Sequence, residues 1–276
     1  MTARLRLLLL AAAVLQAAGC THLFFKPSAR VFSDPAAAGL RCEAVKFRSS
    51  DGTPLTGLFF PAAGVPKATV VHFHGNGQNM TAHYHYSAWL AAEGYNVLVF
   101  DYRGYGASGG RPSLDGAVAD GEAALREALR LPGARPDRVV VFGQSLGGAI
   151  AVAAVAESGF KPAAMVLEGT FYSYRQVAAA VMRESWLTWP LSWLPGFAVS
   201  GRHSPAEYIA AIDSPKVFIH WRGDRTVPFE QGRRLYEAAG GPKELWLPPS
   251  GHIEAFTAHA AVYRPELLRF LAQAVK

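Results

Sequence analysis

Cysteine is scarce in this sequence, and charged residues are few. Two cysteines among 276 residues exclude a disulfide-rich scaffold and a four-cysteine zinc site. A charged fraction of 17% argues against a disordered or coiled-coil chain. No repeat with a period of about 20–50 residues is present, which argues against a solenoid or propeller. What remains is a chain that is 50% hydrophobic and long enough to bury a large core.

The net charge of +6 is mild, and its lysines and arginines are dispersed. A nucleic-acid-binding protein usually gathers such residues on one face or stripe. We therefore expect no nucleic-acid partner.

The first twenty residues have the pattern of an export signal. A short basic start precedes the apolar run Leu7–Leu15, which is followed by small residues. The end of this segment, Ala17-Ala18-Gly19-Cys20, is similar to a bacterial lipoprotein cleavage box, although Ala17 and Gln16 are atypical. We expect a signal peptide over 1–19, lipidation of Cys20, and a lead-in over 20–41. The alternatives are a plain signal peptide cut near Ala18 and a retained N-terminal anchor.

From residue 42 onward, strand and helix patterns alternate. This order predicts an α/β fold, with a mostly parallel sheet covered on both faces and an antiparallel hairpin at its start. A long aromatic-rich stretch at about 172–212 predicts a small helical cap inserted into a domain that spans 42–276. The predicted strands are 42–49, 55–60, 68–73, 96–100, 138–142, 163–167, 217–221 and 245–247; the predicted helices include 82–93, 114–131 and 146–158.

The strongest chemical signal is Gly143-Gln144-Ser145-Leu146-Gly147. This G-x-S-x-G pattern follows an apolar strand and opens a helix of small residues, as a nucleophile elbow requires. A sharp turn there exposes the serine hydroxyl. We expect Ser145 to be the nucleophile, and the alternative is a tight glycine turn with a buried hydroxyl.

A nucleophilic serine needs a base and an orienting acid, in the chain order serine, acid, histidine. His252 lies in a glycine-flanked loop after the last strand, and Asp224 follows the strand before it. We expect His252 to be the base and Asp224 the acid, with Glu168 as the alternative acid. The oxyanion hole needs two backbone N–H groups, which we assign to Leu146 and to Asn76, in the turn after strand 68–73.

Two other motifs have competing interpretations. His72, His74, His83 and His85 suggest a zinc site, but no acidic or cysteine ligand lies nearby in the sequence. The loop DYRGYGASGG (101–110) suggests a phosphate cradle, but it lacks the P-loop spacing, and a structural turn explains it better. We therefore expect no metal and no cofactor.

Trp186, Trp189 and Trp193 are spaced for one face of a helix, which Pro190 and Pro195 interrupt. Three interpretations stay open. The tryptophans pack the cap onto the sheet, line an acyl-binding cleft, or contact a membrane.

Over roughly 42–276 the sequence resembles the α/β-hydrolase superfamily. The motifs that carry this resemblance are HGNG (74–77), DYRGYGASGG (101–110), GQSLGG (143–148), GDRTVPFEQGRRLYEAA (223–239) and SGH (250–252). Within the superfamily the chain looks like bacterial lipoproteins and serine-aminopeptidase-like hydrolases with a small cap. The resemblance implies an eight-stranded, mostly parallel sheet and hydrolysis of an acyl bond by Ser145, Asp224 and His252 without a cofactor.

Together these observations predict an exported, lipid-anchored serine hydrolase of the bacterial cell envelope, acting on carboxylic esters of small or lipid-like molecules. The alternatives are an amide, peptide or thioester hydrolase with the same residues, and a non-catalytic scaffold. The sequence leaves the acyl-chain length and the oligomeric state undetermined.

Overall fold

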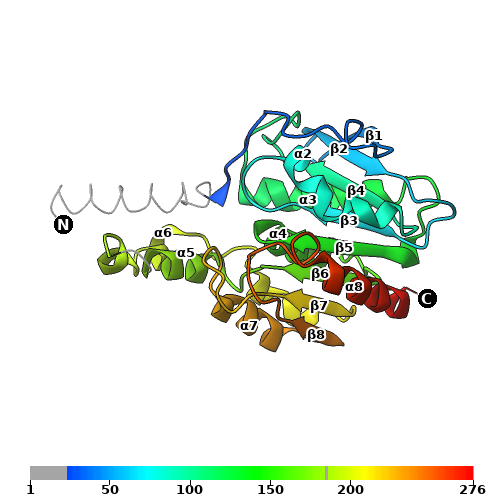
Figure 1. Ribbon diagram of the computed structural model, residues 1–276. Coiled ribbons are helices and arrows are strands. Elements are labelled where there is room, and N and C mark those ends of the chain that lie inside the picture. The colour runs from blue at the N-terminus through cyan, green and yellow to red at the C-terminus, as the bar shows by residue number, and fades with distance from the viewer. Residues whose placement is uncertain (1–23, 184–185, 276) are drawn as a thin grey trace.

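The structure is a computed structural model that describes residues 24–183 and 186–275. One eight-stranded sheet has the order β1-β2-β4-β3-β5-β6-β7-β8 (Figure 1). The strand β2 is antiparallel to both of its neighbours, and the other pairs are parallel. The strands are β1 (Glu43–Arg48), β2 (Pro54–Phe60), β3 (Thr69–Phe73), β4 (Asn96–Asp101), β5 (Val139–Gln144), β6 (Ala164–Glu168), β7 (Lys216–Ile219) and β8 (Lys243–Trp246).

Helices cover both faces of this sheet. Its neighbours on one face are α3, α4 and α7, and on the other α8 and the short α2. The predicted α/β-hydrolase fold, with eight strands and covered faces, is thereby confirmed. The described helices are α2 (Met80–His83), α3 (Leu114–Ala128), α4 (Leu146–Ser158), α5 (Tyr174–Arg183), α6 (Pro195–Ala198), α7 (Phe229–Ala238) and α8 (Ala260–Ala274).

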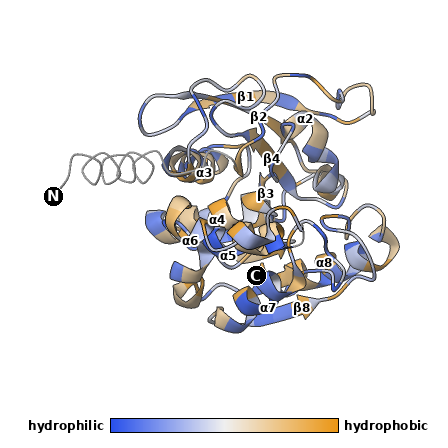
Figure 2. Cartoon of the chain, turned by 90° about the vertical axis from the view of Figure 1, so that its left-hand side faces the viewer, coloured by the Kyte–Doolittle hydropathy of each residue, from blue (hydrophilic) through white to orange (hydrophobic). Residues whose placement is uncertain are grey.

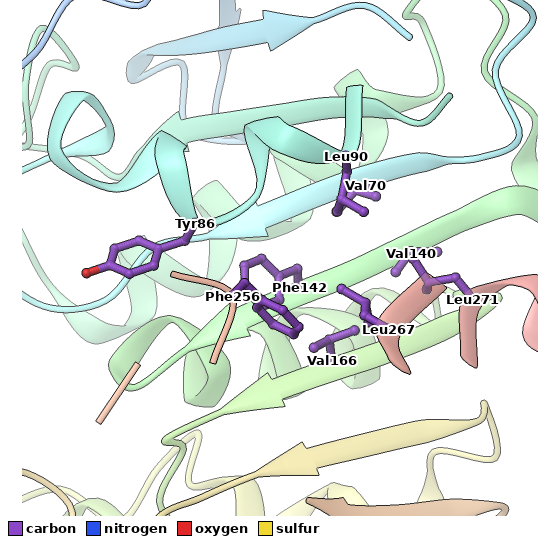
Figure 3. A pocket seen from close by; sticks show the side chains of 9 residues that line it. All are labelled: Val70, Tyr86, Leu90, Val140, Phe142, Val166, Phe256, Leu267 and Leu271. Carbon is purple, nitrogen blue, oxygen red and sulfur yellow. The ribbon is translucent and has the colours of Figure 1, made fainter. Parts of the chain in front are cut away.

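The core forms because alternate residues of each strand point to opposite faces. In β5, Val139 and Val141 belong to the α3–α4 side, whereas Val140 and Phe142 belong to the α8 side. The core on both faces of β5 is apolar, so a continuous run of apolar, β-branched residues suits this strand. On the α8 side a narrow apolar gap, too small for a water molecule, lies between the strands and that helix (Figure 3). Its walls belong to the core rather than to a ligand site.

One predicted helix is wrong in form. The stretch 82–93 is not a single helix: α2 ends at His83, and 3₁₀ turns follow over Tyr84–Tyr86 and Ala88–Ala91. Ser87 separates them with a non-helical backbone, φ −127°. Its hydroxyl lies 2.9 Å from His72 Nδ1 in the sheet. This buried hydrogen bond competes with a regular helix at that residue.

The insertion between β6 and β7 contains α5, α6 and several 3₁₀ turns. In Figure 1, α5 and α6 extend beyond the end of the sheet, on the side where the described chain begins. Within the described ranges, no helix combines the length and the apolar character needed to cross a bilayer. The predicted signal peptide and Cys20 lie outside the described residues.

Candidate active site

Ser145 occupies a sharp turn between β5 and α4. Its backbone has φ 52° and ψ −119°, a conformation that is rare for a residue with a side chain. The Ser145 N–H donates to the Glu168 carbonyl at 2.7 Å, which fixes the turn to the end of β6. The predicted elbow geometry is therefore present.

The turn is possible because the second residue of α4 is a glycine, Gly147, at a point where other chain segments come close. A Cβ on Gly147 would lie 2.2 Å from the Phe73 carbonyl oxygen and 2.3 Å from that of His74. Any side chain there would push the β3 loop away from the elbow. The glycine thus holds the two halves of the predicted oxyanion hole together.

Asp224 and His252 meet although they are 28 residues apart. The His252 Nδ1–H donates to Asp224 Oδ2 at 2.6 Å. The other carboxylate oxygen accepts the backbone N–H groups of Thr226 (2.8 Å) and Val227 (2.9 Å). The Asp224 side chain is fully buried, so its acceptor atoms have fixed directions.

The His252 ring lies against the elbow. A Cβ on Gly169 would come within 2.9 Å of His252 Cε1, so the ring passes directly over this glycine. Gly169 follows Glu168, whose carbonyl accepts from Ser145. Among the described residues, His252 Nε2 has no hydrogen-bond partner, and no bond joins it to the Ser145 hydroxyl. In an enzyme without substrate such a bond is often long and tightens when substrate binds.

Leu146 begins α4 and Asn76 lies in the loop after β3, and these two residues are the predicted donors of the oxyanion hole. Leu146 is the first residue of α4, so its N–H has no acceptor within the helix. The Asn76 side chain faces the lead-in, where its Oδ1 accepts from the Lys26 N–H at 2.8 Å and from the Tyr105 hydroxyl at 3.3 Å. This anchorage of the loop by the segment before the domain has no local sequence signal.

Glu168, the alternative acid, has a different position. Its carboxylate accepts from the Gln144 side chain at 2.6 Å and from the Ala255 N–H at 2.9 Å. Burial raises the pKa of Glu168 to about 7. Glu168 therefore connects Gln144, the residue before Ser145, with the loop that carries His252, whereas the His252 ring bonds to Asp224.

A buried hydrogen-bond chain leads to this carboxylate. The Ser87 hydroxyl donates to His72 Nδ1, His72 Nε2–H to Gln144 Oε1 at 3.0 Å, and Gln144 to Glu168. Burial also lowers the pKa of His72 well below its usual value, which suits a neutral ring. Since both of its ring nitrogens are engaged, His72 has none left for a metal ion.

The other residues that the sequence singled out, in the loops after β3 and β4 and at Cys42, have contacts or a pKa that fit a structural role. His74 donates from Nδ1 to the Gly75 carbonyl at 2.8 Å, as a turn-stabilising histidine does. In the loop 101–110, Asp101 accepts from the Met80 N–H, and Arg103 pairs with Asp120 and Asp51. These contacts fit the structural interpretation of the loop. Burial raises the pKa of the Cys42 thiol to about 11, which does not suit a nucleophile.

Comparison with known proteins assigns the family. The family model described as serine aminopeptidase, S33, matches residues 64–210, which include the elbow and the predicted oxyanion loop. The chain is an α/β hydrolase of this family. Figure 1 shows that the matched region includes the centre of the sheet and most of the insertion, with α5 and α6.

Relatives of this hydrolase span most of its length. It is 35% identical to the uncharacterized protein YfhR of Escherichia coli O157:H7, over 92% of this chain and 88% of that protein. It is 32% identical to the α/beta hydrolase domain-containing protein WAV2 of Arabidopsis thaliana, over 86% and 80%. Its fold is similar to that of the Pyrococcus furiosus esterase Pf2001, with a TM-score of 0.76, 22% identity, and coverage of 92% and 99%.

Proposed function

We propose that the protein is an exported serine hydrolase that cleaves carboxylic esters with Ser145, His252 and Asp224. The observation that carries the proposal is the 2.6 Å bond from His252 Nδ1 to Asp224 Oδ2, which leaves Nε2 without a partner among the described residues. The ring lies over Gly169, the residue after the one whose carbonyl accepts the Ser145 N–H. A base oriented on one nitrogen and free on the other is what a hydroxyl nucleophile needs.

The mechanism follows from these positions. His252 Nε2 takes the proton of the Ser145 hydroxyl as its oxygen attacks the ester carbonyl. Asp224 keeps the proton on Nδ1 and stabilises the imidazolium that forms. His252 then gives the proton to the leaving alcohol, and an acyl group remains on Ser145. Water, activated by the same ring, cleaves this acyl-enzyme and regenerates the serine.

The developing oxyanion needs donors that are already in place. The N–H groups of Leu146 and Asn76 supply them in this proposal. Each such donor contributes roughly 3–4 kcal/mol to transition-state stabilisation in enzymes of this kind. The Lys26 and Tyr105 bonds to the Asn76 side chain would hold the second donor in position.

We propose an ester as the substrate because of the residues at the site and because of the similarity to solved esterases. Several solved structures with this fold are described as esterases, the Pyrococcus furiosus protein among them. The second candidate is an amide or peptide hydrolase, since the matched family is described as serine aminopeptidase. Matched ester, thioester and aminoacyl-amide substrates with one acyl group separate these activities: we expect kcat/KM to be largest for the ester.

The direct experiment is active-site labelling. A fluorophosphonate probe should label the wild type at Ser145, and Ser145→Ala should abolish labelling and lower turnover by up to about 10⁶-fold. The control is Ser250→Ala, which removes an exposed hydroxyl two residues from His252 and should leave labelling intact. A folded Ser145→Ala protein that still takes up the probe would exclude Ser145, and a wild type without any labelling would favour the scaffold alternative.

We place the protein at the bacterial envelope through a lipid on Cys20. Multiple acyl chains hold a protein durably, since each buried CH₂ contributes about 0.8 kcal/mol. Mass spectrometry of the mature N-terminus tests this placement. A lipidated Cys20 is expected, and an unmodified N-terminal peptide that starts elsewhere would overturn it.

A further inference from the structure

We propose that the insertion docks on the surface of a lipid bilayer through an exposed tryptophan face. This face is defined by Trp186, Leu187, Trp189, Leu191, Trp193 and Phe197. The proposal goes beyond the ester chemistry. It uses the proposed lipid site at Cys20 for one distance argument only.

The first observation is the exposure of these side chains. Of the eleven large apolar side chains that are exposed in the described residues, seven lie between Val181 and Phe197. Trp186 is 84% exposed, Trp189 62% and Trp193 60%. These values overturn the interpretation that the tryptophans pack the cap onto the sheet. A cluster of this kind is typical of a surface that meets a partner or a membrane.

The local backbone explains why the face is uncovered. Pro190 and Pro195 limit the segment to a 3₁₀ turn, Trp189–Leu191, and the four-residue helix α6. Trp193 has a ring contact with Phe197, at 6.1 Å between centroids, within the face itself. Figure 2 looks at the molecule from this side and shows α5 and α6 in front of α4.

The second observation is where the described chain begins. Phe24 packs edge-on against Tyr174, the first residue of α5, with ring centroids 5.3 Å apart. Cys20 is only four residues earlier, and four extended residues reach at most about 14 Å. A lipid on Cys20 would therefore hold the base of the insertion close to the bilayer, which favours a lipid surface over a distant protein partner.

The third observation is positive charge beside the face. An open hollow of about 590 Å³ is lined by Trp193 together with Arg175, Arg183 and Arg234. Glu230, whose carboxylate also lines this hollow, is already paired with Arg233 at 2.8 Å. Within the described residues, neither Arg175 nor Arg234 pairs with a carboxylate; they bond to the Val199 carbonyl and the Gln176 side chain.

Tryptophan and arginine side by side suit the bilayer interface. Tryptophan rings settle at the depth of the headgroups, and arginine binds their phosphates. The bilayer we propose is therefore one with anionic phospholipid headgroups. The described part of the lead-in, which starts at Phe24, also bonds through Lys26 to Asn76, so this segment connects the insertion with the candidate active site.

The experiment uses the full chain purified from bacterial membranes and reconstituted in vesicles of phosphatidylcholine and phosphatidylglycerol with brominated acyl chains. Bromine quenches tryptophans that enter the bilayer. Three of the six tryptophans lie on the face, whereas Trp221 is fully buried. We expect emission to fall by up to about twofold relative to unbrominated vesicles, because tryptophan prefers the interface.

The double variant Trp189→Asp/Trp193→Asp keeps Trp186 as a reporter and should lose this quenching. The matched control is Val65→Asp/Val262→Asp, which places the same two charges on side chains that are 91% and 60% exposed, in the loop between β2 and β3 and on α8. It should be quenched like the wild type. Replacing phosphatidylglycerol by phosphatidylcholine should weaken quenching, and an unchanged value would overturn the role of the arginines.

Three results would overturn docking. If the wild type sediments with the vesicles but is not quenched, the proposed lipid anchor stands and the proposed docking face is refuted. A wild type that stays in solution refutes both. An unquenched protein that is a dimer in detergent, split by the double variant, assigns the face to a second copy. Fluorophosphonate labelling of each sample reports separately whether the proposed hydrolase chemistry holds.

Discussion

Glu168 holds the backbone of Ala255: its Oε1 accepts the Ala255 N–H at 2.9 Å. The bond joins the end of β6 to the loop that carries His252, three residues away. Because Gln144 bonds to the other oxygen, a single buried carboxylate fixes both the elbow and the base loop. The predictions below start from this arrangement.

Stability should depend on pH through Glu168. Burial raises its pKa from the ordinary 4.5 to about 7, so the folded state holds this proton more tightly than the unfolded chain does. Its contribution is complete below about pH 4.5 and is lost as pH rises toward 7. Glu168→Gln should flatten this slope in urea titrations across that range. An identical pH slope in wild type and variant would contradict the assignment.

Asp224→Asn should lower kcat by about 10⁴-fold while the protein stays folded, because the amide favours the wrong tautomer of His252. Glu168→Gln is the comparison. It removes one of two acceptors and should act mainly on stability, by about 1–3 kcal/mol. Steady-state kinetics with a short ester decides between them. If Asp224→Asn were nearly silent and Glu168→Gln inactive, the role of orienting acid would pass to Glu168.

Gly147→Ala should disable the elbow. The added methyl would collide with the Phe73 and His74 carbonyl oxygens, and the β3 loop with Asn76 would have to move. A displacement of about 1 Å in such a site costs on the order of 10²-fold in rate. Gly196→Ala is the control, since a Cβ there meets nothing within 4 Å. Equal kcat/KM values for both variants would show that the close approach at Gly147 is unimportant.

His203 should secure the end of the insertion. Its ring nitrogens lie 2.7 Å from Asp115 Oδ1 on α3 and 2.5 Å from Glu157 Oε1 on α4. His203→Ala removes both bonds, and we expect a loss of about 2 kcal/mol, which lowers Tm by roughly 5 °C. Thermal denaturation measures this loss, with the exposed His85→Ala as the control. A Tm unchanged from wild type would show that α3 and α4 hold the segment without His203.

Local patterns predicted the sheet and the pairing of Asp224 with His252. The apolar run before Gly143 predicted a buried central strand, which β5 is. The turn after this strand places Ser145 at the edge of the sheet. Asp224 and His252 follow strands at the same edge, so topology alone brings them together. The chain order of serine, acid and histidine then left few alternatives.

The long-range polar hydrogen bonds could not be predicted from the sequence. The Glu168–Ala255 bond spans 87 residues and the Lys26–Asn76 bond spans 50, and neither leaves a periodic signal. The helix predicted at 82–93 was wrong for a related reason, because a bond between Ser87 and His72, in the strand before it, competes with helical geometry. The tryptophan spacing fitted a helix face, but the two prolines shortened the helix.

The burial of α4 has a consequence for how the molecule opens. Ten of its thirteen residues are buried, whereas α5 buries Tyr174 and Val177 alone among its ten. Amide protons of α4 should therefore exchange with solvent only when the whole fold opens, while those of the insertion exchange through local fraying. The elbow thus belongs to the part of the chain whose amides exchange most slowly, whereas the insertion can open locally while the sheet stays closed.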